Sequence, residues 1–188
     1  RPCGVPEHTE EIISMYSPNM PGVVFDQKYW WTDGWDSLNF GQDYDFETPF
    51  FAQFQKLREK TPLLALANTN STNSEWCNPG VDNKNCHLSF AATKNENANY
   101  CNRIANCRDS FDLYLGNKAE LSYSSLFVEN CTKVHFSMYV RNCLDSWFLY
   151  DCNNCSDCIG CANLRNKQFY IFNKPYTKEE YQKIKDEL

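Results

Sequence analysis

The sequence predicts a mainly β protein: a parallel β-solenoid of ~12-residue rungs with a mixed α/β aromatic N-terminal cap and a C-terminal capping helix. Three observations predict this fold class. The second half of the chain repeats every twelve residues, the first half is rich in aromatic residues and has no repeat, and the last segment is amphipathic. We expect the cap over residues 1–75, the solenoid over 76–176 and the helix over 177–188.

The repeat is visible when the chain is written in lines of twelve from Ala105. The second place of the lines is mostly Asn and the third mostly Cys: Asn106, Lys118, Asn130, Asn142, Asn154 and Asn166, then Cys107, Ala119, Cys131, Cys143, Cys155 and Lys167. A short period without helical 3.6 spacing predicts strands stacked about 4.8 Å apart on copies of themselves. Asn suits a corner because it tolerates the left-handed conformation. A rung of 24 residues with two similar halves would leave the same trace.

The two places that hold small residues predict a narrow interior. The third and sixth places carry Cys, Ala, Ser and Val, where no large side chain would fit. The seventh place carries larger groups, which we expect to stack on one face: Phe111, Tyr123, His135 and Trp147.

The flanking segments predict a loop and two helices. The polar stretch LANTNSTNSEWCNPGVDNKNC is expected to form a loop leading into irregular first rungs. FETPFFAQFQKLREKTP predicts a helix that starts near Pro49, ends before Pro62 and has an apolar stripe with Phe54. Thr177 and Glu180 form a capping box that predicts the last helix, which we expect to pack over the final rung through Tyr181 and Ile184.

Four cysteines form one evenly spaced run, C-x-x-C-x-x-C-x-x-C: Cys152, Cys155, Cys158 and Cys161. Buried thiols are the favoured interpretation, because free cysteine is a small and readily buried apolar residue. Disulfides and a metal or iron–sulfur site remain alternatives, although the even spacing differs from that of ferredoxins and zinc ribbons. We therefore expect no cofactor and no metal ligand, with these four cysteines as the weak candidates.

An aromatic and acidic segment is the candidate ligand face of the first half: Trp30, Trp31, Asp33, Trp35 and Asp36. Such a segment is compatible with a carbohydrate site, and it is more typical of a cover for an open core. Both interpretations stay open at this point.

The bulk properties exclude several classes of partner. The net charge of -6 argues against binding to nucleic acid, which requires a surplus of Lys and Arg. No apolar run approaches the length of about 20 residues that a membrane-spanning helix needs, so no membrane insertion is expected. No signal peptide is recognisable at the start of the chain.

Several segments together resemble a known group of proteins: IISMYSP, YWWTDGWD, GQDYDFETPFFAQF, NSTNSEWCN and CANLRNKQFYIFNKPYTKEEY. The chain resembles, over nearly its full length, an uncharacterised family of Cys-rich repeat proteins that is abundant in candidate-phyla-radiation bacteria such as Parcubacteria. Members of that family usually carry a zinc ribbon near the N-terminus. At the matching positions this chain has Cys3, Pro6, Asp26 and Tyr29, so the resemblance implies that the zinc site is lost. We expect a bacterial cytoplasm as the location, because the cysteines are expected to be reduced and no signal peptide is recognisable.

The leading expectation for function is a non-enzymatic structural or protein-interaction module. Its partner is expected to be a protein, with self-association through the solenoid ends as a further possibility. One alternative is a glycan-binding or glycan-hydrolysing protein that uses the Trp/Asp-rich segment. Another is a metal-binding protein that uses the run of four cysteines. No phosphate loop, Ser-His-Asp set or H-E-x-x-H motif points to an enzyme.

Overall fold

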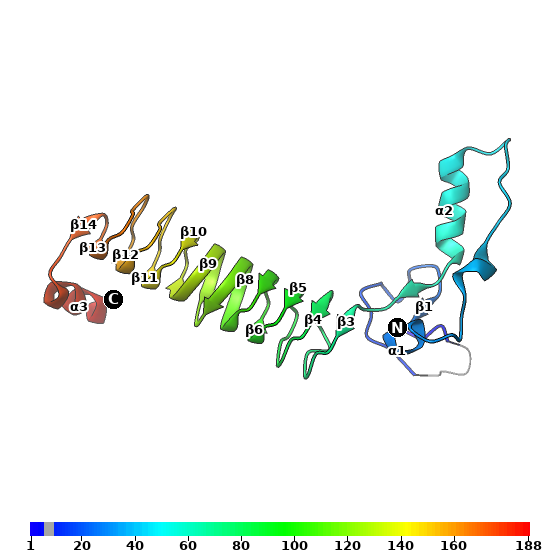
Figure 1. Ribbon diagram of the computed structural model, residues 1–188, viewed down its shortest axis with the longest axis horizontal. Coiled ribbons are helices and arrows are strands. Elements are labelled where there is room, and N and C mark those ends of the chain that lie inside the picture. The colour runs from blue at the N-terminus through cyan, green and yellow to red at the C-terminus, as the bar shows by residue number, and fades with distance from the viewer. Residues whose placement is uncertain (6–9) are drawn as a thin grey trace. The chain divides into compact units, whose positions relative to one another are not determined.

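The computed structural model describes residues 1–5 and 10–188, and the chain folds into two compact units, Arg1–Asn68 and Thr69–Leu188 (Figure 1). The first unit consists of short elements: β1 (Val24–Phe25), α1 (Gln27–Trp30), a 3-10 helix η1 (Ser37–Phe40), α2 (Phe50–Lys60) and β2 (Leu63–Leu64). β1 and β2 pair in parallel. The predicted helix is α2, which begins after Pro49 and ends at Thr61, before Pro62.

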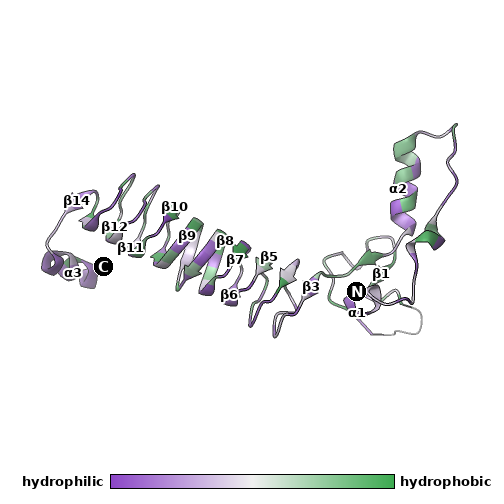
Figure 2. Cartoon of the chain, viewed as in Figure 1, coloured by the Kyte–Doolittle hydropathy of each residue, from purple (hydrophilic) through white to green (hydrophobic). Residues whose placement is uncertain are grey.

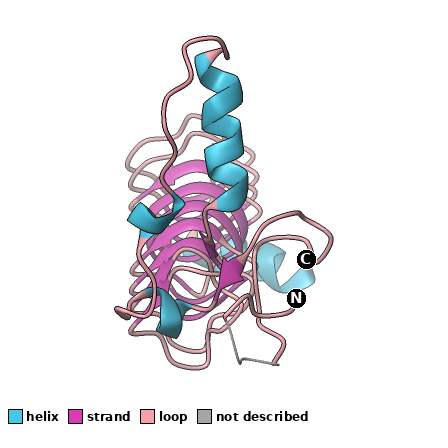
Figure 3. Cartoon of the chain, turned by 90° about the vertical axis from the view of Figure 1, so that its right-hand side faces the viewer, coloured by secondary structure: helices cyan, strands magenta, loops and turns pink. Residues whose placement is uncertain are grey.

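The second unit is a parallel β-solenoid, as the repeat predicts. Its strands are β3 (Asn68–Thr69), β4 (Gly80–Val81), β5 (Phe90–Thr93), β6 (Glu96–Asn99), β7 (Asn102–Ala105), β8 (Arg108–Glu120), β9 (Tyr123–His135), β10 (Met138–Arg141), β11 (Leu144–Trp147), β12 (Ser156–Ile159), β13 (Gln168–Ile171) and β14 (Lys174–Pro175). Each residue pairs with the residue twelve positions further on, for example Gly116 with Val128. One turn of the solenoid is therefore twelve residues and not 24, and Figure 3 shows the strands of successive coils nested on one another.

Regular coils begin earlier than the sequence predicts. The Asn-rich segment that was expected to be a loop already follows the twelve-residue register, since Thr72 pairs with Lys84 and Gly80 with Ala92. Stacked asparagine side chains support these first coils: the side-chain amide of Asn73 donates to Asn85, Asn85 donates to Asn97, and the three bonds of this ladder end on Asp109. The polar composition therefore reflects an amide ladder rather than a loop.

A period of three residues lies inside the period of twelve. Every third residue has a left-handed backbone, for example Asn106, Asp109 and Asp112, with φ near +50°. The residue after it points inward, so one coil has four interior positions, as in Cys107, Ser110, Leu113 and Gly116. Left-handed backbone costs an ordinary L-residue about 1–2 kcal/mol, and Asn and Asp bear it best. This explains the Asn column.

The interior residues are small and polar because their own backbone needs partners. Within each three-residue repeat, two backbone N–H groups donate to carbonyls of neighbouring coils. For example, Asn106 N–H donates to the carbonyl of Thr93, and Glu96 N–H donates to the carbonyl of Cys107. The N–H of the interior residue points inward. Where the previous coil has Ser or Asn at that position, the side chain accepts this N–H, as the thiols of Cys101 and Cys131 also do. Leu149 N–H donates to Ser137 Oγ at 3.0 Å, for example. Ser, Asn and Cys inside the solenoid thus satisfy buried backbone groups that would otherwise be costly.

The C-terminal helix α3 (Lys178–Glu187) starts at Thr177 with the predicted capping box. Tyr181 and Ile184 face the solenoid as expected, but the expected position over the final rung is wrong. They pack against the flank of the last three coils, in a cluster with Trp147, Ile159 and Ile171. The edge of β13 is instead covered by β14, which pairs with it in antiparallel fashion.

Candidate functional site

The four cysteines of the C-x-x-C run occupy the four interior positions of a single coil. The period of three residues turns each of them inward, and all four are buried: Cys152, Cys155, Cys158 and Cys161. None of the cysteines in the described chain forms a disulfide. Cys131, Cys143 and Cys155 lie in one column, as the repeat predicts, with Cys143 N–H bonded to Cys131 Sγ. The C-x-x-C spacing therefore follows from the three-residue period of the backbone, which turns every third side chain inward.

The environment of these thiols keeps most of them protonated. Burial raises the pKa of Cys152 to about 11 and that of Cys101 to about 12. Cys158 and Cys161 interact with each other, and the hydrogen bond lowers the pKa of Cys161 to about 7 while it raises that of Cys158. In the described part of the chain, no three His, Cys, Asp or Glu side chains are arranged to hold a metal ion. The geometry is that of a core.

The Trp/Asp-rich segment is divided between packing and solvent. Trp30 and Trp35 pack on each other with ring centroids 4.5 Å apart, and Trp35 Nε1 donates to the carbonyl of Trp30. The carboxylate of Asp36 accepts the N–H of Leu38 and thereby starts the 3-10 helix. Trp31, 74% exposed, and Asp33 remain on the surface. The structure therefore leaves two of the five candidate residues free to form a ligand face.

The positions that match a zinc ribbon in the resemblance do come together in part. Cys3 Sγ lies 3.7 Å from Asp26 Oδ2, and the same carboxylate accepts the backbone N–H of Lys28 and Tyr29 at the start of α1. The Tyr29 ring packs edge-on against Phe25. Pro6, the remaining position, lies outside the described residues.

The outer surface of the solenoid has four edges, because each coil exposes four pairs of outward residues that stack on the pairs of the next coil. We name the four edges by their residues in one coil, and residues twelve positions before or after belong to the same edge. Edge 1 holds His135 and Phe136, edge 2 Met138 and Tyr139, edge 3 Arg141 and Asn142, and edge 4 Leu144 and Asp145. Edges 1 and 2 adjoin each other, and so do edges 3 and 4. The solenoid thus has two distinct halves.

One half is aromatic and the other polar. Edges 1 and 2 carry Phe111, Tyr123, Phe136, Trp147 and Phe148, and Tyr114, Leu126, Phe127, Tyr139 and Tyr150. Edges 3 and 4 carry Asn and charged residues, such as Glu129, Arg141, Asn154, Arg108 and Glu120. Most of the aromatic side chains are exposed although they are large and apolar.

Sequence reasoning found only part of this surface. The seventh-place aromatics were expected to stack, and His135 and Trp147 do approach each other, with ring centroids 6.3 Å apart. Edge 2 was missed. Its signal was the apolar tenth and eleventh places of each line, which become adjacent outward positions once the period of three is recognised.

Neighbouring rings of edges 1 and 2 contact each other in two ways. Phe136 and Phe148 are stacked at 5.2 Å with an interplanar angle of 10°, and Phe127 and Tyr139 at 4.8 Å with an angle of 17°. Tyr123 meets Phe136, and Tyr139 meets Tyr150, edge-on at 85° and 88°. The two edges therefore carry rows of touching rings, which suit packing against other apolar side chains.

An apolar groove runs along edge 1 beside α3. It has a volume of about 700 Å³, and its lining includes Trp147, Ile159 and Ile171 from three successive coils, Phe148 from edge 1, and Ile184 from α3. Gly160 stands between Phe148 and Phe172 in the aromatic column, and the Phe172 ring packs closely against it. A Cβ at Gly160 would lie 2.6 Å from a carbon of the Phe172 ring. A side chain at this position would therefore displace that ring from the groove lining.

The interface under α3 is imperfectly satisfied. Lys185 Nζ bonds to Asp145 Oδ1 at 2.7 Å and lies 5.2 Å above the Trp147 ring. Trp147 Nε1 and the Tyr181 hydroxyl are buried and have no hydrogen-bond partner in the described chain. Each buried polar group without a partner lowers the stability of the folded state by about 1–3 kcal/mol. Apolar packing and the ion pair between Lys185 and Asp145 must therefore offset this loss to hold α3 in place.

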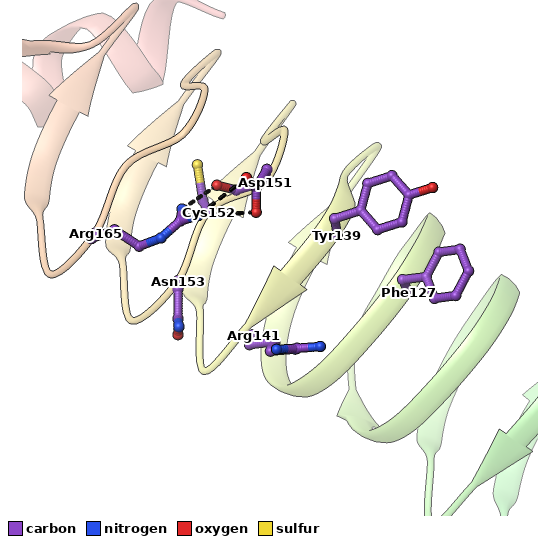
Figure 4. A pocket seen from close by; sticks show the side chains of 7 residues that line it. All are labelled: Phe127, Tyr139, Arg141, Asp151, Cys152, Asn153 and Arg165. Atoms are coloured by element: carbon purple, nitrogen blue, oxygen red, sulfur yellow. Dashed lines mark hydrogen bonds and ion pairs between the residues drawn. The ribbon is translucent and has the colours of Figure 1, made fainter.

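A second hollow, of about 230 Å³, lies between edges 2 and 3 (Figure 4). Both of its arginines are engaged: Arg165 binds the carboxylate of Asp151 with two contacts of 3.1 Å, and Arg141 lies 3.3 Å from Glu129. Because the guanidinium groups already face carboxylates, this hollow is a poor site for an anion.

The first unit has an exposed aromatic cluster of its own on α2. Phe50 is 58% exposed, Phe51 80% and Phe54 47%, whereas the buried residue of the helix is Gln53. The Gln53 side chain bonds to the backbone of Asp45, which holds the helix against a polar loop. The predicted apolar stripe of α2 therefore faces away from its own unit's packing, and Figure 2 shows the apolar colour over the first turns of this helix.

Comparisons add no further constraint. No protein-family model matches the chain, and no curated protein is detectably similar to it in sequence. None of the helices in the described residues is long and apolar enough to cross a membrane.

Proposed function

We propose that this protein is a non-enzymatic interaction module whose solenoid binds other proteins through edges 1 and 2. The observation that carries the proposal is the continuous ladder of exposed aromatic side chains on these two adjoining edges, opposite a polar half. Interface cores are enriched in aromatic residues and Met and depleted of charge, and the two edges have this composition. The period of three keeps the ladder rigid because every coil is bonded to its neighbours.

The packing of α3 supports a protein as the partner. This amphipathic helix already covers one flank of the solenoid through Tyr181 and Ile184. A helix rises about 5.4 Å per turn, close to the coil spacing of about 4.8 Å, so its side chains can follow successive coils.

The glycan alternative has less support. Sugars stack on the faces of aromatic rings, and Phe136 and Phe148 each cover one face of the other. In the Trp/Asp-rich segment, Trp30 and Trp35 are used for packing. Trp31 alone among these tryptophans retains a largely exposed ring.

A peptide-display selection tests the proposal. A random peptide library is selected on the full chain, and the enriched peptides are measured on two double variants. Phe136→Asn with Phe148→Asn alters edge 1, and Phe127→Asn with Tyr139→Asn alters edge 2. All four positions have positive φ, which Asn tolerates, so the fold should be kept. Lys118→Asn, at a positive-φ position of the polar half, is the matched control.

The expected result is a set of apolar peptides whose affinity falls about tenfold or more on an edge variant and is unchanged on Lys118→Asn. Peptides that bind all variants equally, or no enrichment at all, would contradict the proposal. A glycan array provides the opposing test: selective glycan binding that is lost in Trp31→Ala would favour the carbohydrate alternative.

A further inference from the structure

We infer that the groove beside α3 receives the α2 helix of a second copy of this chain. The inference rests on the proposed function, because it names the partner of edge 1. It joins two features that the chain leaves unsatisfied: an apolar groove of about 700 Å³ on the solenoid, and a helix with an exposed aromatic stripe in the first unit.

The chemistry of α2 fits that groove. Phe50 and Phe54 lie one turn apart on α2 and are stacked on each other, and Phe51 beside them is 80% exposed. The groove has an apolar floor of Trp147 and Ile159. An exposed aromatic stripe gains free energy by leaving water, at about 25 cal/mol per Å² of apolar surface buried.

The lengths also match. α2 has 11 residues, which corresponds to about 16 Å at 1.5 Å per residue. The groove extends from His135 to Ile171 over three coil spacings, which corresponds to about 14 Å at 4.8 Å per coil. One helix of this length therefore covers the groove from end to end.

The charges are complementary. The second half of α2 carries Lys56, Arg58 and Lys60 against the single acid Glu59. On α3, Glu180 and Glu187 lie one turn before and one turn after Ile184, which lines the groove, and both are exposed. Lys185 of α3 is already paired with Asp145. Lys183 is exposed beside them, and Glu180 also bonds to Thr177 in the capping box. A basic helix entering the groove thus meets a carboxylate on either side of Ile184.

This contact would be heterologous, because α2 of one copy meets the groove of another. Such an interface either builds open chains or closes into a ring, and two copies that exchange their α2 helices form the smallest closed ring. The association should therefore increase with the protein concentration.

Sedimentation velocity of the full chain under reducing conditions, from micromolar to millimolar concentration, tests the inference. We expect concentration-dependent association that weakens about tenfold or more in two variants. Phe51→Gln with Phe54→Gln removes the exposed stripe with a good helix former. Phe148→Asn removes one wall of the groove at a positive-φ position. Phe46→Gln and Lys118→Asn are the matched controls, since both change exposed side chains outside α2, the groove and edges 1 and 2, and they should associate like the unaltered chain.

Mixing the two variants gives the sharpest result. The α2 variant keeps an intact groove and the Phe148 variant keeps an intact helix, so the mixture should form one-to-one pairs that stop at the dimer. A chain that stays monomeric at all concentrations would overturn the inference, as would association that survives in either variant or a mixture that does not recover. Display peptides that bind edge 2 while the chain remains monomeric would leave the proposed function standing and remove this inference alone.

Discussion

The backbone N–H of Cys143 donates a hydrogen bond to the sulfur of Cys131, one coil earlier, across 3.4 Å. The N–H of Leu149 meets the hydroxyl of Ser137 in the same way at 3.0 Å. In both pairs the interior side chain serves as an acceptor for an inward N–H that no carbonyl reaches. The cysteines and serines of this solenoid are therefore equivalent parts of one hydrogen-bonding scheme, and this equivalence can be tested by exchange.

Replacing Cys143 by Ser should be tolerated, whereas Cys143→Lys should not. A hydroxyl fits the interior and can donate to the carbonyl of Arg141, as the thiol does now. A lysine would bury an unpaired charge, and we expect a loss of about 3 kcal/mol or more in the free energy of unfolding. Urea denaturation measures both variants. Equal losses in the two would show that size, and not polarity, limits this position.

Lys118→Asn should raise the melting temperature. Lys118 has a φ of 50° and stands between Asn106 and Asn130 in its column. Asn bears a left-handed backbone better than Lys and can join amide ladders such as that between Asn154 and Asn166. We expect a gain of about 0.5–1 kcal/mol. Lys118→Ala is the control, and a similar gain in that variant would assign the effect to loss of the lysine charge.

Two substitutions of Tyr181 distinguish the contribution of its apolar ring to stability from that of its unpartnered hydroxyl. Tyr181→Phe should be neutral or stabilising, because the hydroxyl is buried without a hydrogen-bond partner. Tyr181→Ala removes a ring that is 1% exposed and should cost about 3 kcal/mol. Hydrogen exchange should show that the alanine variant opens α3 while the first coils stay protected. Faster exchange throughout the solenoid would mean that α3 is essential to the coils themselves.

Stability should fall at alkaline pH. Burial raises the pKa of Cys152 to about 11 and that of Cys101 to about 12, from an ordinary value of 9.0. The folded state therefore holds these protons more tightly than the unfolded state, so the stabilisation is complete below pH 9 and is lost as the pH rises towards 11–12. Within the pair Cys158 and Cys161, the pKa of Cys158 is raised and that of Cys161 is lowered. Melting temperatures measured from neutral to alkaline pH should show this decline, and a flat profile would contradict it.

The same thiols should be unreactive in the native protein. A thiol reagent should modify few cysteines before denaturation and nearly all of them afterwards, because the thiolate is the reactive form and burial disfavours it. A chelator should leave the melting temperature unchanged. A melting temperature that drops with chelator would instead identify the four-cysteine coil as a metal centre, since structural metal is coupled to folding.

The sequence by itself determined the solenoid. Its twelve-residue period, the Asn column and the small third and sixth places each follow from a coil that stacks on itself, where like residues must lie on like residues. The column of Cys131, Cys143 and Cys155 was predictable for the same reason. So were the ends of α2 and the capping box of α3, which depend on local backbone chemistry.

The tertiary structure alone decided which way the repeated residues point and which of them come into contact. Four cysteines at intervals of three become one interior coil only because Asn106 and its equivalents adopt a left-handed backbone every third residue, and that period is hidden beneath the period of twelve. The flank position of α3 depends on the shape presented by Trp147, Ile159 and Ile171, which are twelve residues apart in sequence and adjacent in space. The groove is assembled from residues of successive coils and of α3, such as Phe148, Gly160 and Ile184. A contact between distant residues is a property of the assembled surface, and no local pattern in the chain encodes it.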